Sequence, residues 1–221
     1  ISVMADPSRN FGEAAVRYAE FRPDYPQEIF DFLLSHITSG RICAVDLGAG
    51  SGQATRKLSR LCDEVIAVEP DGRLVEDSRL PANVKIQLNA AETVDFASES
   101  LDAVISATAF HWMDQMLICY NAARWLKPGG AFFPFALDAF QVAGEASDYF
   151  ADEFGKWRPY RDQRLVDCYD YGAALRESGA FASVIPYRQI LRHELPSAAA
   201  AGLISTFSFA RDYARAPGGG D

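Results

Sequence analysis

Cysteine is scarce in this sequence, and the few cysteines form no metal or disulfide pattern. The 221 residues contain no C-x-x-C motif and no Cys/His pair at the spacing of a zinc site. The four cysteines are Cys43, Cys62, Cys119 and Cys168. Isolated cysteines of this kind are typical of free thiols in a reducing compartment, so we expect no metal site.

Positive charge is also in short supply. Lysine and arginine total 21 against 30 aspartates and glutamates, which gives a net charge of −9 and a pI of about 4.9. An acidic chain without a Lys/Arg cluster repels phosphate backbones and anionic membrane surfaces. We therefore expect neither a nucleic-acid partner nor a membrane partner.

Long apolar runs are missing as well. The longest small-apolar run, at 198–204, is far too short to cross a bilayer. The first ten residues, "ISVMADPSRN", lack the basic end and apolar stretch of a signal peptide. The sequence thus predicts a soluble, cytoplasmic protein, and it leaves the choice between monomer and homodimer open.

The sequence does contain an alternation of strand and helix patterns in a chain that is 49% hydrophobic. This alternation predicts an α/β fold with a doubly wound, mostly parallel sheet, whose ligands bind beyond the carboxyl ends of the strands. Pro134 predicts an edge or a bulge in the fifth strand. The expected strands are 41–48, 64–70, 83–90, 101–109, 131–138 and 183–195. The expected helices include 26–37, 53–61, 72–80, 197–214 and one from 114 that ends in a Lys-Pro-Gly-Gly turn at 127–130.

The stretch "AVDLGAGSGQAT", Ala44 to Thr55, places three glycines directly after the first strand. Glycines at a helix start let a ligand approach the backbone N–H groups, although a simple tight turn also uses them. The dinucleotide pattern G-x-G-x-x-G fails, because the third glycine, Gly52, comes one residue early. Asp46 would repel a pyrophosphate and suits a cationic amino group, and Glu69 after the second strand can accept hydrogen bonds from a ribose. S-adenosylmethionine is a ligand that meets all three conditions.

Two later stretches agree with an adenosine ligand. In "NAAETVDF", Glu92 can approach an adenine amino group, the Ala91 backbone its ring edge, and Phe96 can pack below it. In "ISATAFHWMD", Thr108 and Ala109 would lie beside the sulfonium. Phe110, His111 and Trp112 would then turn over the ligand.

These stretches carry a family resemblance. "VDLGAGSGQAT", "VIAVEP", "NAAETVDF", "SLDAVISATAFHWMD" and "WLKPGGAF" resemble the class I S-adenosylmethionine-dependent methyltransferases, and "YAEFRPDYP" with "FHWMD" is similar to their trans-aconitate methyltransferase branch. The resemblance implies a Rossmann-like, seven-stranded sheet with an antiparallel final strand. Because the sequence ends at Asp221, we expect that strand to be missing.

The resemblance also implies a division of the chain and a set of cofactor contacts. One methyltransferase domain would comprise N-terminal lid helices at 1–40, a cofactor-binding core at 41–138, an aromatic helical cap at 139–185, and a C-terminal strand and helix at 186–221. The implied cofactor contacts are Tyr18, Arg22, Asp46, Gly48, Ala49, Gly50, Gln53, Glu69, Pro70, Ala91, Glu92, Thr108 and Phe110.

The expected activity is in-line methyl transfer to a small molecule, with a carboxylate among the candidate acceptors. His111 is the candidate base, the alternative being that His111 and Trp112 shape the pocket. The expected substrate contacts are Trp112, Trp157, Tyr160 and Arg161, and packing within the cap is the alternative for the last three.

Two other functions stay open from the sequence. One is an NAD(P)-dependent oxidoreductase on a similar sheet, against which Asp46 and the shifted third glycine argue. The other is a non-catalytic module that binds S-adenosylmethionine. A nucleic-acid methyltransferase is disfavoured, because the fourth strand ends in "ATAFHW" and not in an Asn/Asp-Pro-Pro-aromatic motif.

Overall fold

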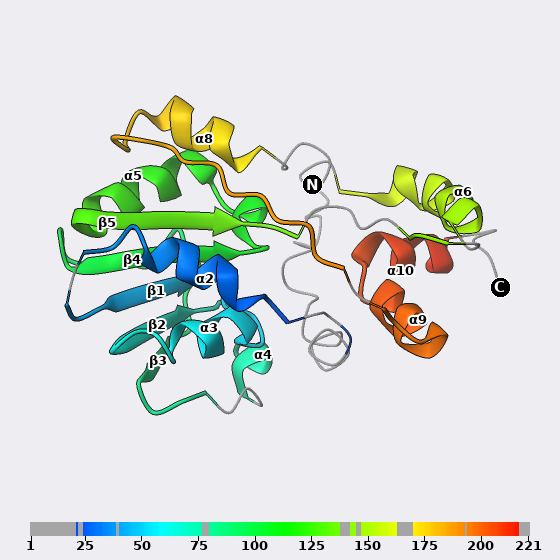
Figure 1. Ribbon diagram of the computed structural model, residues 1–221, viewed down its shortest axis with the longest axis horizontal. Coiled ribbons are helices and arrows are strands. Elements are labelled where there is room, and N and C mark those ends of the chain that lie inside the picture. The colour runs from blue at the N-terminus through cyan, green and yellow to red at the C-terminus, as the bar shows by residue number, and fades with distance from the viewer. Residues whose placement is uncertain are drawn as a thin grey trace, which may run out of the picture.

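A five-stranded parallel sheet forms the centre of the computed structural model (Figure 1). The structure describes residues 21, 24–38, 40–76, 80–137, 142–144, 147–162, 170–192 and 194–216. The strand order is β3-β2-β1-β4-β5. The strands are β1 (Cys43–Leu47), β2 (Glu64–Val68), β3 (Val84–Gln87), β4 (Leu101–Ala107) and β5 (Leu126–Phe135).

The strand order reverses between β1 and β4. From β1 the chain builds outward to β2 and β3, and it then returns to place β4 on the other side of β1. In a doubly wound sheet this switch point opens a crevice at the carboxyl ends of the two strands. The residues that follow β1 and β4 are therefore the ones positioned to meet a ligand.

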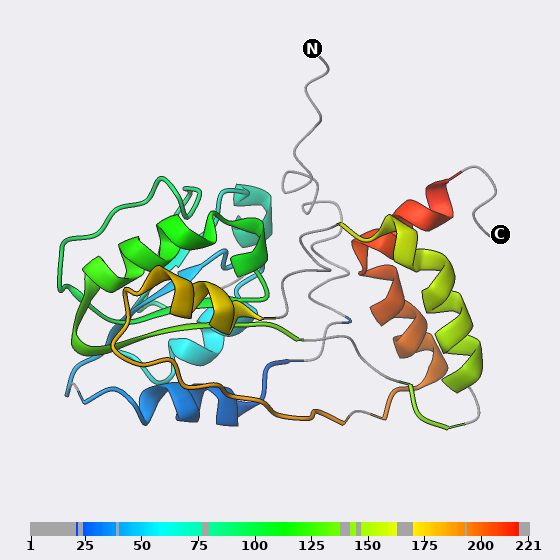
Figure 2. The same ribbon diagram turned by 90° about the horizontal axis from the view of Figure 1, so that it is seen from above.

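Helices cover both faces of the sheet (Figure 2). One face carries α2 (Gln27–Leu34) and α3 (Gln53–Leu58), and the other carries α5 (Gln115–Trp125) and α8 (Tyr171–Ser178). The short α4 (Gly72–Glu76) follows β2. Side chains of β1 alternate between the two layers: Ala44 packs with α2 and α3, whereas Val45 and Leu47 pack with α5 and α8.

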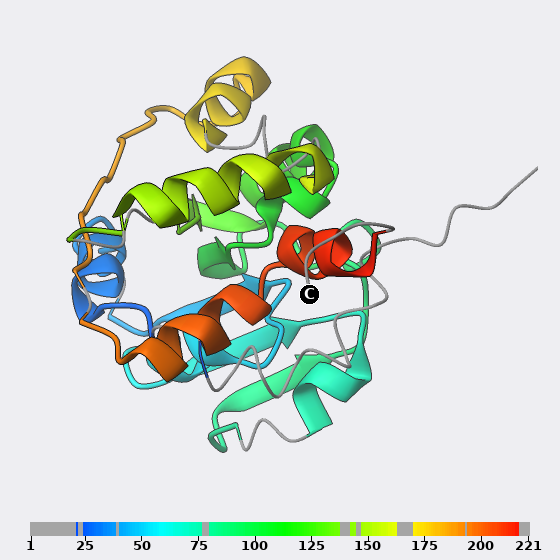
Figure 3. The same cartoon turned by 90° about the vertical axis from the view of Figure 1, so that its right-hand side faces the viewer.

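A separate group of helices lies beyond the carboxyl ends of the strands (Figures 1 and 3). We call it the cap. It consists of α6 (Ser147–Trp157), the 3-10 turn η4 (Arg158–Tyr160), α9 (Ser197–Ser205) and α10 (Ser208–Arg215). Within the cap α10 contacts α6, η4 and α9. Phe21 also touches it, since its ring lies where a Cβ on Gly202 of α9 would stand.

The expected strand at 183–195 is wrong: the described part of this segment is extended but forms no strand. Its Tyr187 ring packs 4.5 Å from that of Phe32 and 6.3 Å from that of Phe133, measured between centroids. Ring packing therefore holds the segment near α2 and β5, and Pro186 has no N–H to donate to a ladder. The described residues form five parallel strands where the resemblance implied seven.

Two predicted boundaries also differ. The helix expected from 114 ends at Trp125, before the Lys-Pro-Gly-Gly residues as expected, but these residues belong to β5, which begins at Leu126 and not at residue 131. Leu126 already pairs with Leu101, and Pro128 lacks the N–H a helix needs. The helix expected over 197–214 is divided into α9 and α10. At the break, the hydroxyls of Ser205 and Thr206 donate to the carbonyls of Gly202 and Leu203. Such side-chain bonds compete with helix continuation.

Other sequence expectations are confirmed. The first four strands and the helices at 26–37, 53–61 and 72–80 form within the predicted ranges. Pro134 lies on an edge strand, since β5 pairs with β4 alone among the described residues. No helix in the described part of the chain is both long and apolar enough to cross a bilayer.

Candidate cofactor site

The glycine loop after β1 lies over the end of β2. The N–H groups of Gly48 and Ala49 both donate to the Val68 carbonyl, at 2.9 and 3.0 Å. Gly48, Gly50 and Gly52 have φ values of 71°, 56° and 77°, a left-handed region that favours glycine. A Cβ on Gly48 would stand 2.6 Å from that of Ala109, whereas one on Gly50 would meet nothing within 4 Å. The loop thus packs tightly against the end of β4 at Gly48 and leaves Gly50 open.

Asp46 is a fully buried carboxylate directly before this loop. It shares the face of Ala44, and its Oδ2 accepts a 2.6 Å hydrogen bond from the Thr55 hydroxyl in α3. Its Oδ1 is buried, and no donor among the described residues bonds to it. Burial raises the pKa of Asp46 to about 7; the Thr55 bond opposes this, and the negative charge of Glu69 adds to it. A buried acceptor without a donor is costly, so Asp46 is suited to a cationic ligand group.

Glu69 follows β2, and both of its oxygens are held by backbone donors. The Gly50 N–H donates to Oε2 and the Asp71 N–H to Oε1, each at 2.9 Å. Burial raises the pKa of Glu69, and these two hydrogen bonds oppose that rise. A carboxylate offers about four lone-pair sites, so acceptor capacity remains beside the glycine loop. The hydrogen bond from the Gly50 N–H to Glu69 joins two cofactor contacts that the sequence predicts from separate stretches.

The segment after β3 supplies Ala91 and Glu92. Ala91 is buried at 5% exposure, and Glu92 Oε1 accepts a 3.0 Å hydrogen bond from the Asp114 N–H. Asp114 itself caps α5, because its side chain accepts from the Leu117 N–H. Asp114, the N-cap residue of α5, thus fixes Glu92 beside the turn that follows β4.

The turn after β4 is built around Thr108. Its φ of +54° is unusual for a β-branched residue. The Thr108 N–H donates to the Phe135 carbonyl at 2.7 Å, and Oγ1 is 3.1 Å from the Tyr25 hydroxyl. Tyr25 was not singled out as a site residue from the sequence. It stands in the quoted stretch "YAEFRPDYP", but only the fold brings it to the end of β4.

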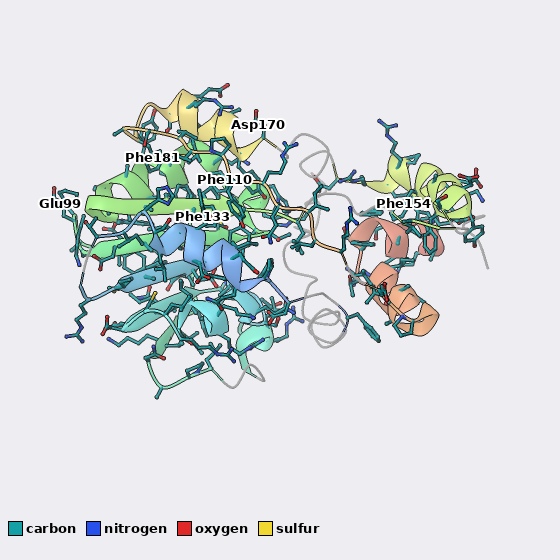
Figure 4. The ribbon with its side chains drawn as sticks, viewed as in Figure 1. Glu99, Phe110, Phe133, Phe154, Asp170 and Phe181 are labelled. Atoms are coloured by element: carbon teal, nitrogen blue, oxygen red, sulfur yellow. The ribbon has the colours of Figure 1, made fainter. Side chains whose placement is uncertain are left out.

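His111 lies in the 3-10 turn η3 (Phe110–Trp112) and is nearly buried, at 6% exposure. Its Nδ1 is 2.6 Å from the hydroxyl of Tyr171, the first residue of α8. Phe110, labelled in Figure 4, is fully buried. Its ring is edge-to-face with those of Phe132 and Tyr171. Trp112 is half-buried and its ring centroid is 4.9 Å from that of His111.

The three other predicted substrate residues lie in the cap. Trp157 is almost buried and packs on Phe154, which Figure 4 labels on α6. Tyr160 packs edge-to-face with Tyr213, and the Arg161 guanidinium lies 5.6 Å from the ring centroid of Phe209. All three thus contribute to the packing between α6, η4 and α10.

The remaining predicted residues are placed as follows. Ala49 is buried, Gln53 begins α3 and is half-buried, and Pro70 is exposed after Glu69. Tyr18 and Arg22 lie outside the described residues, as does Cys168. Among the residues that the structure describes, no cluster of three His, Cys, Asp or Glu side chains is arranged to hold a metal.

Comparisons with known proteins agree with this geometry. Residues 45–133 match the family described as a methyltransferase domain. A protein named as a methyltransferase in Dictyostelium discoideum is 36% identical over 55% of this chain and 46% of its own length. An uncharacterized methyltransferase of Mycobacterium tuberculosis is 39% identical over 57% of this chain and 51% of its own length. The chain thus spans about half the length of the curated relatives it matches.

A solved structure shares the architecture. A protein from Anaeromyxobacter dehalogenans, named as a type II methyltransferase, superposes with a TM-score of 0.68 at 25% identity. The match covers 88% of this chain and 82% of that one. The resemblance to the trans-aconitate branch stays a prediction, because none of these three matches carries that name. The parallel sheet and this superposition show the Rossmann-like α/β fold of class I methyltransferases, and residues 45–133 are similar in sequence to the methyltransferase domain family.

Proposed function

We propose that this chain binds S-adenosylmethionine at the carboxyl ends of β1, β2 and β4 and transfers its methyl group to a small-molecule acceptor. The observation that carries the proposal is the pair of buried carboxylates around the glycine loop. Asp46 has an oxygen without a partner, and Glu69 is clamped against Gly50. A ligand with a cationic amino group and a ribose, and without phosphate, is complementary to this pair.

Asp46 would receive the amino group of the cofactor. Its unpartnered Oδ1 requires a donor, and a charged amino group provides one while offsetting the cost of burying the carboxylate. Gly50 supports the same fit, because the space beside its Cα is open and its backbone can be approached closely. A pyrophosphate at this depth would meet two buried acids.

Glu69, Ala91 and Glu92 would hold the adenosine. The backbone bonds to both oxygens of Glu69 set its orientation in advance, so little ordering remains when ribose hydroxyls donate to it. Glu92 is oriented by the Asp114 N–H and can accept from an adenine amino group. Ala91 is small and buried, which suits contact between its backbone and the ring edge.

The cofactor, when bound, supplies a methyl group on a positively charged sulfur. The residues of the chain then have to hold the acceptor in line, about 3 Å from that carbon, and to exclude water. Thr108 is proposed beside the sulfonium, and His111 is proposed to take a proton from an acceptor that carries one. Its Nδ1 lies 2.6 Å from the Tyr171 hydroxyl, a contact that would orient the imidazole for such a role.

The acceptor is proposed to lie between the sheet and the cap. Trp112 at the end of η3 and Trp157, Tyr160 and Arg161 in the cap offer aromatic surface and one guanidinium. This combination favours a small acceptor with a carboxylate, which Arg161 would pair with. An acceptor of that kind needs no base, so His111 would then orient rather than deprotonate.

Calorimetric titration with S-adenosylhomocysteine, with NADH as the matched comparison, tests the cofactor. Micromolar binding of the first and none of the second is the expected result, and the reverse would overturn the proposal. A panel of small carboxylates, amines and hydroxyl compounds with methyl-labelled S-adenosylmethionine then tests transfer. Tight cofactor binding without transfer to any member would favour a non-catalytic binding module.

A further inference from the structure

We propose that Tyr25 is a positioning residue of the cofactor site: it holds Thr108 in its left-handed conformation and thereby shapes the wall that Gly48 packs against. The inference rests on the proposed function, since the wall is taken to border S-adenosylmethionine. It assigns a role to a residue of the segment that precedes α2.

Thr108 adopts a conformation that its side chain disfavours. A β-branched residue at φ +54° is a conformational outlier, which persists only where the surroundings impose it. Only one other described residue that is not glycine, Glu99, has a positive φ, and it lies in the acidic turn before β4. Thr108 instead directly follows β4, at the switch point of the sheet.

Two hydrogen bonds impose this conformation. The 2.7 Å bond from the Thr108 N–H to the Phe135 carbonyl extends the pairing of β4 with β5 by one residue. The 3.1 Å contact between Oγ1 and the Tyr25 hydroxyl fixes the side chain. The first belongs to the sheet, whereas the second comes from a residue 83 positions away in the sequence.

Tyr25 is rigidly placed for this task. It is 5% exposed, and its ring is edge-to-face with that of Phe135 at 5.2 Å between centroids. Phe135 is the residue whose carbonyl receives the Thr108 N–H. The ring and the hydroxyl of Tyr25 therefore act on the same strand end, one by packing and the other by hydrogen bonding.

The consequence reaches the glycine loop through Ala109. The Ala109 side chain stands where a Cβ on Gly48 would be, so a change in the turn at Thr108 moves the surface that the loop rests on. Met113 contributes to the same contact, with its methyl group 3.1 Å from that position. Loss of the Tyr25 hydroxyl should thus loosen a cofactor site whose acidic residues are all still present.

The test is a pair of Tyr25→Phe variants, one in the natural chain and one carrying Thr108→Gly. Glycine adopts positive φ without strain and needs no hydrogen bond to stay there. We expect Y25F alone to weaken S-adenosylhomocysteine binding by about three- to ten-fold, the usual effect of one hydrogen bond. The affinity of T108G alone is the reference for the double variant, and adding Y25F to T108G should change nothing further.

Tyr187→Phe is the matched control. Tyr187 packs on the same aromatic side of β5, against Phe133, but its hydroxyl donates to Gln189, so this variant should leave affinity unchanged. Equal weakening by Y25F with and without T108G, or unchanged affinity in Y25F, would overturn the inference. Absence of binding in the natural chain would instead overturn the proposed function, and thermal denaturation of each variant reports its folding separately.

Discussion

At the carboxyl edge of the sheet, Asp46 and Glu69 are 0% and 6% exposed, whereas in the cap α10 buries no residue and α6 buries only Trp157. The first region is set by backbone hydrogen bonds between neighbouring loops. The second is set by pairs of aromatic rings within and between helices, most of which are partly exposed. The two regions are thus stabilised by different interactions, hydrogen bonds at the edge of the sheet and ring packing in the cap.

Under the proposed function, the difference would separate the two ligands. Buried, hydrogen-bonded carboxylates are preorganised, which would suit the cofactor. Aromatic packing between partly exposed helices is adjustable and would suit the acceptor. Four predictions test this contrast.

The largest effect is expected at Gly48. In Gly48→Ala the added methyl meets that of Ala109 at 2.6 Å and φ is +71°, so strain and overpacking together should cost about 2–4 kcal/mol of folding stability. Gly50→Ala has the same backbone region with nothing within 4 Å, and should cost about 1–2 kcal/mol. Urea denaturation measures both; equal losses would show that the close contact is unimportant.

Glu69→Ala should weaken S-adenosylhomocysteine binding by ten-fold or more. It removes a charge-assisted acceptor worth about 1.5–3 kcal/mol and frees the Gly50 N–H. Asp46→Ala should weaken binding by a similar factor, because it removes the carboxylate that is proposed to receive the amino group of the cofactor. Glu64→Ala is the control, because Glu64 begins the same strand at the opposite end and pairs with Lys85. Calorimetry that found E69A and E64A alike would remove Glu69 from the site.

Asp46 should make the stability of the ligand-free protein depend on pH. Its folded pKa of about 7 exceeds the ordinary 3.8, so between these values the folded state binds more protons than the unfolded state. Stability should therefore fall as pH rises from 4 to 7, by up to about 1.4 kcal/mol per pH unit, and Glu69 adds in the same direction. Asp46→Asn should reduce this slope in urea titrations at pH 5 and 7.

The exposed Glu28 provides the charge control for that experiment, since Glu28→Gln also removes one carboxylate but from the surface of α2. Identical slopes in D46N and the natural chain would mean that Asp46 is charged throughout this pH range. In that case the unpartnered oxygen would have to be stabilised in another way.

The smallest effect is expected in the cap. Arg161→Ala should cost about 0.5–1 kcal/mol of stability through the lost contact with Phe209, and should leave S-adenosylhomocysteine affinity within about two-fold. Arg161→Lys retains the charge and tests whether the planar group matters. A large loss of cofactor affinity in R161A, measured by calorimetry, would show that the cap contributes to cofactor binding. The two regions would then not differ in the way described above.

Much of the cofactor half is readable from the sequence. The loop glycines, Asp46 and Glu69 follow strands whose apolar pattern is strong, so their place at one edge of the sheet follows from topology rules. The segment at 183–195 was misread because its alternating apolar residues imitate a strand. Tyr187 instead packs on Phe32 and Phe133, and no ladder forms in the described part.

The sequence by itself thus determined the parallel sheet, its switch point and the residue types that line it, because these depend on local periodicity and chain order. Only the tertiary structure decided the contacts between distant segments. It leaves Asp46 Oδ1 without a partner, ties Glu69 to Gly50, and brings Tyr25 to Thr108 and Tyr171 to His111. Such contacts depend on how side chains from separate elements fill one space, and no local pattern encodes that.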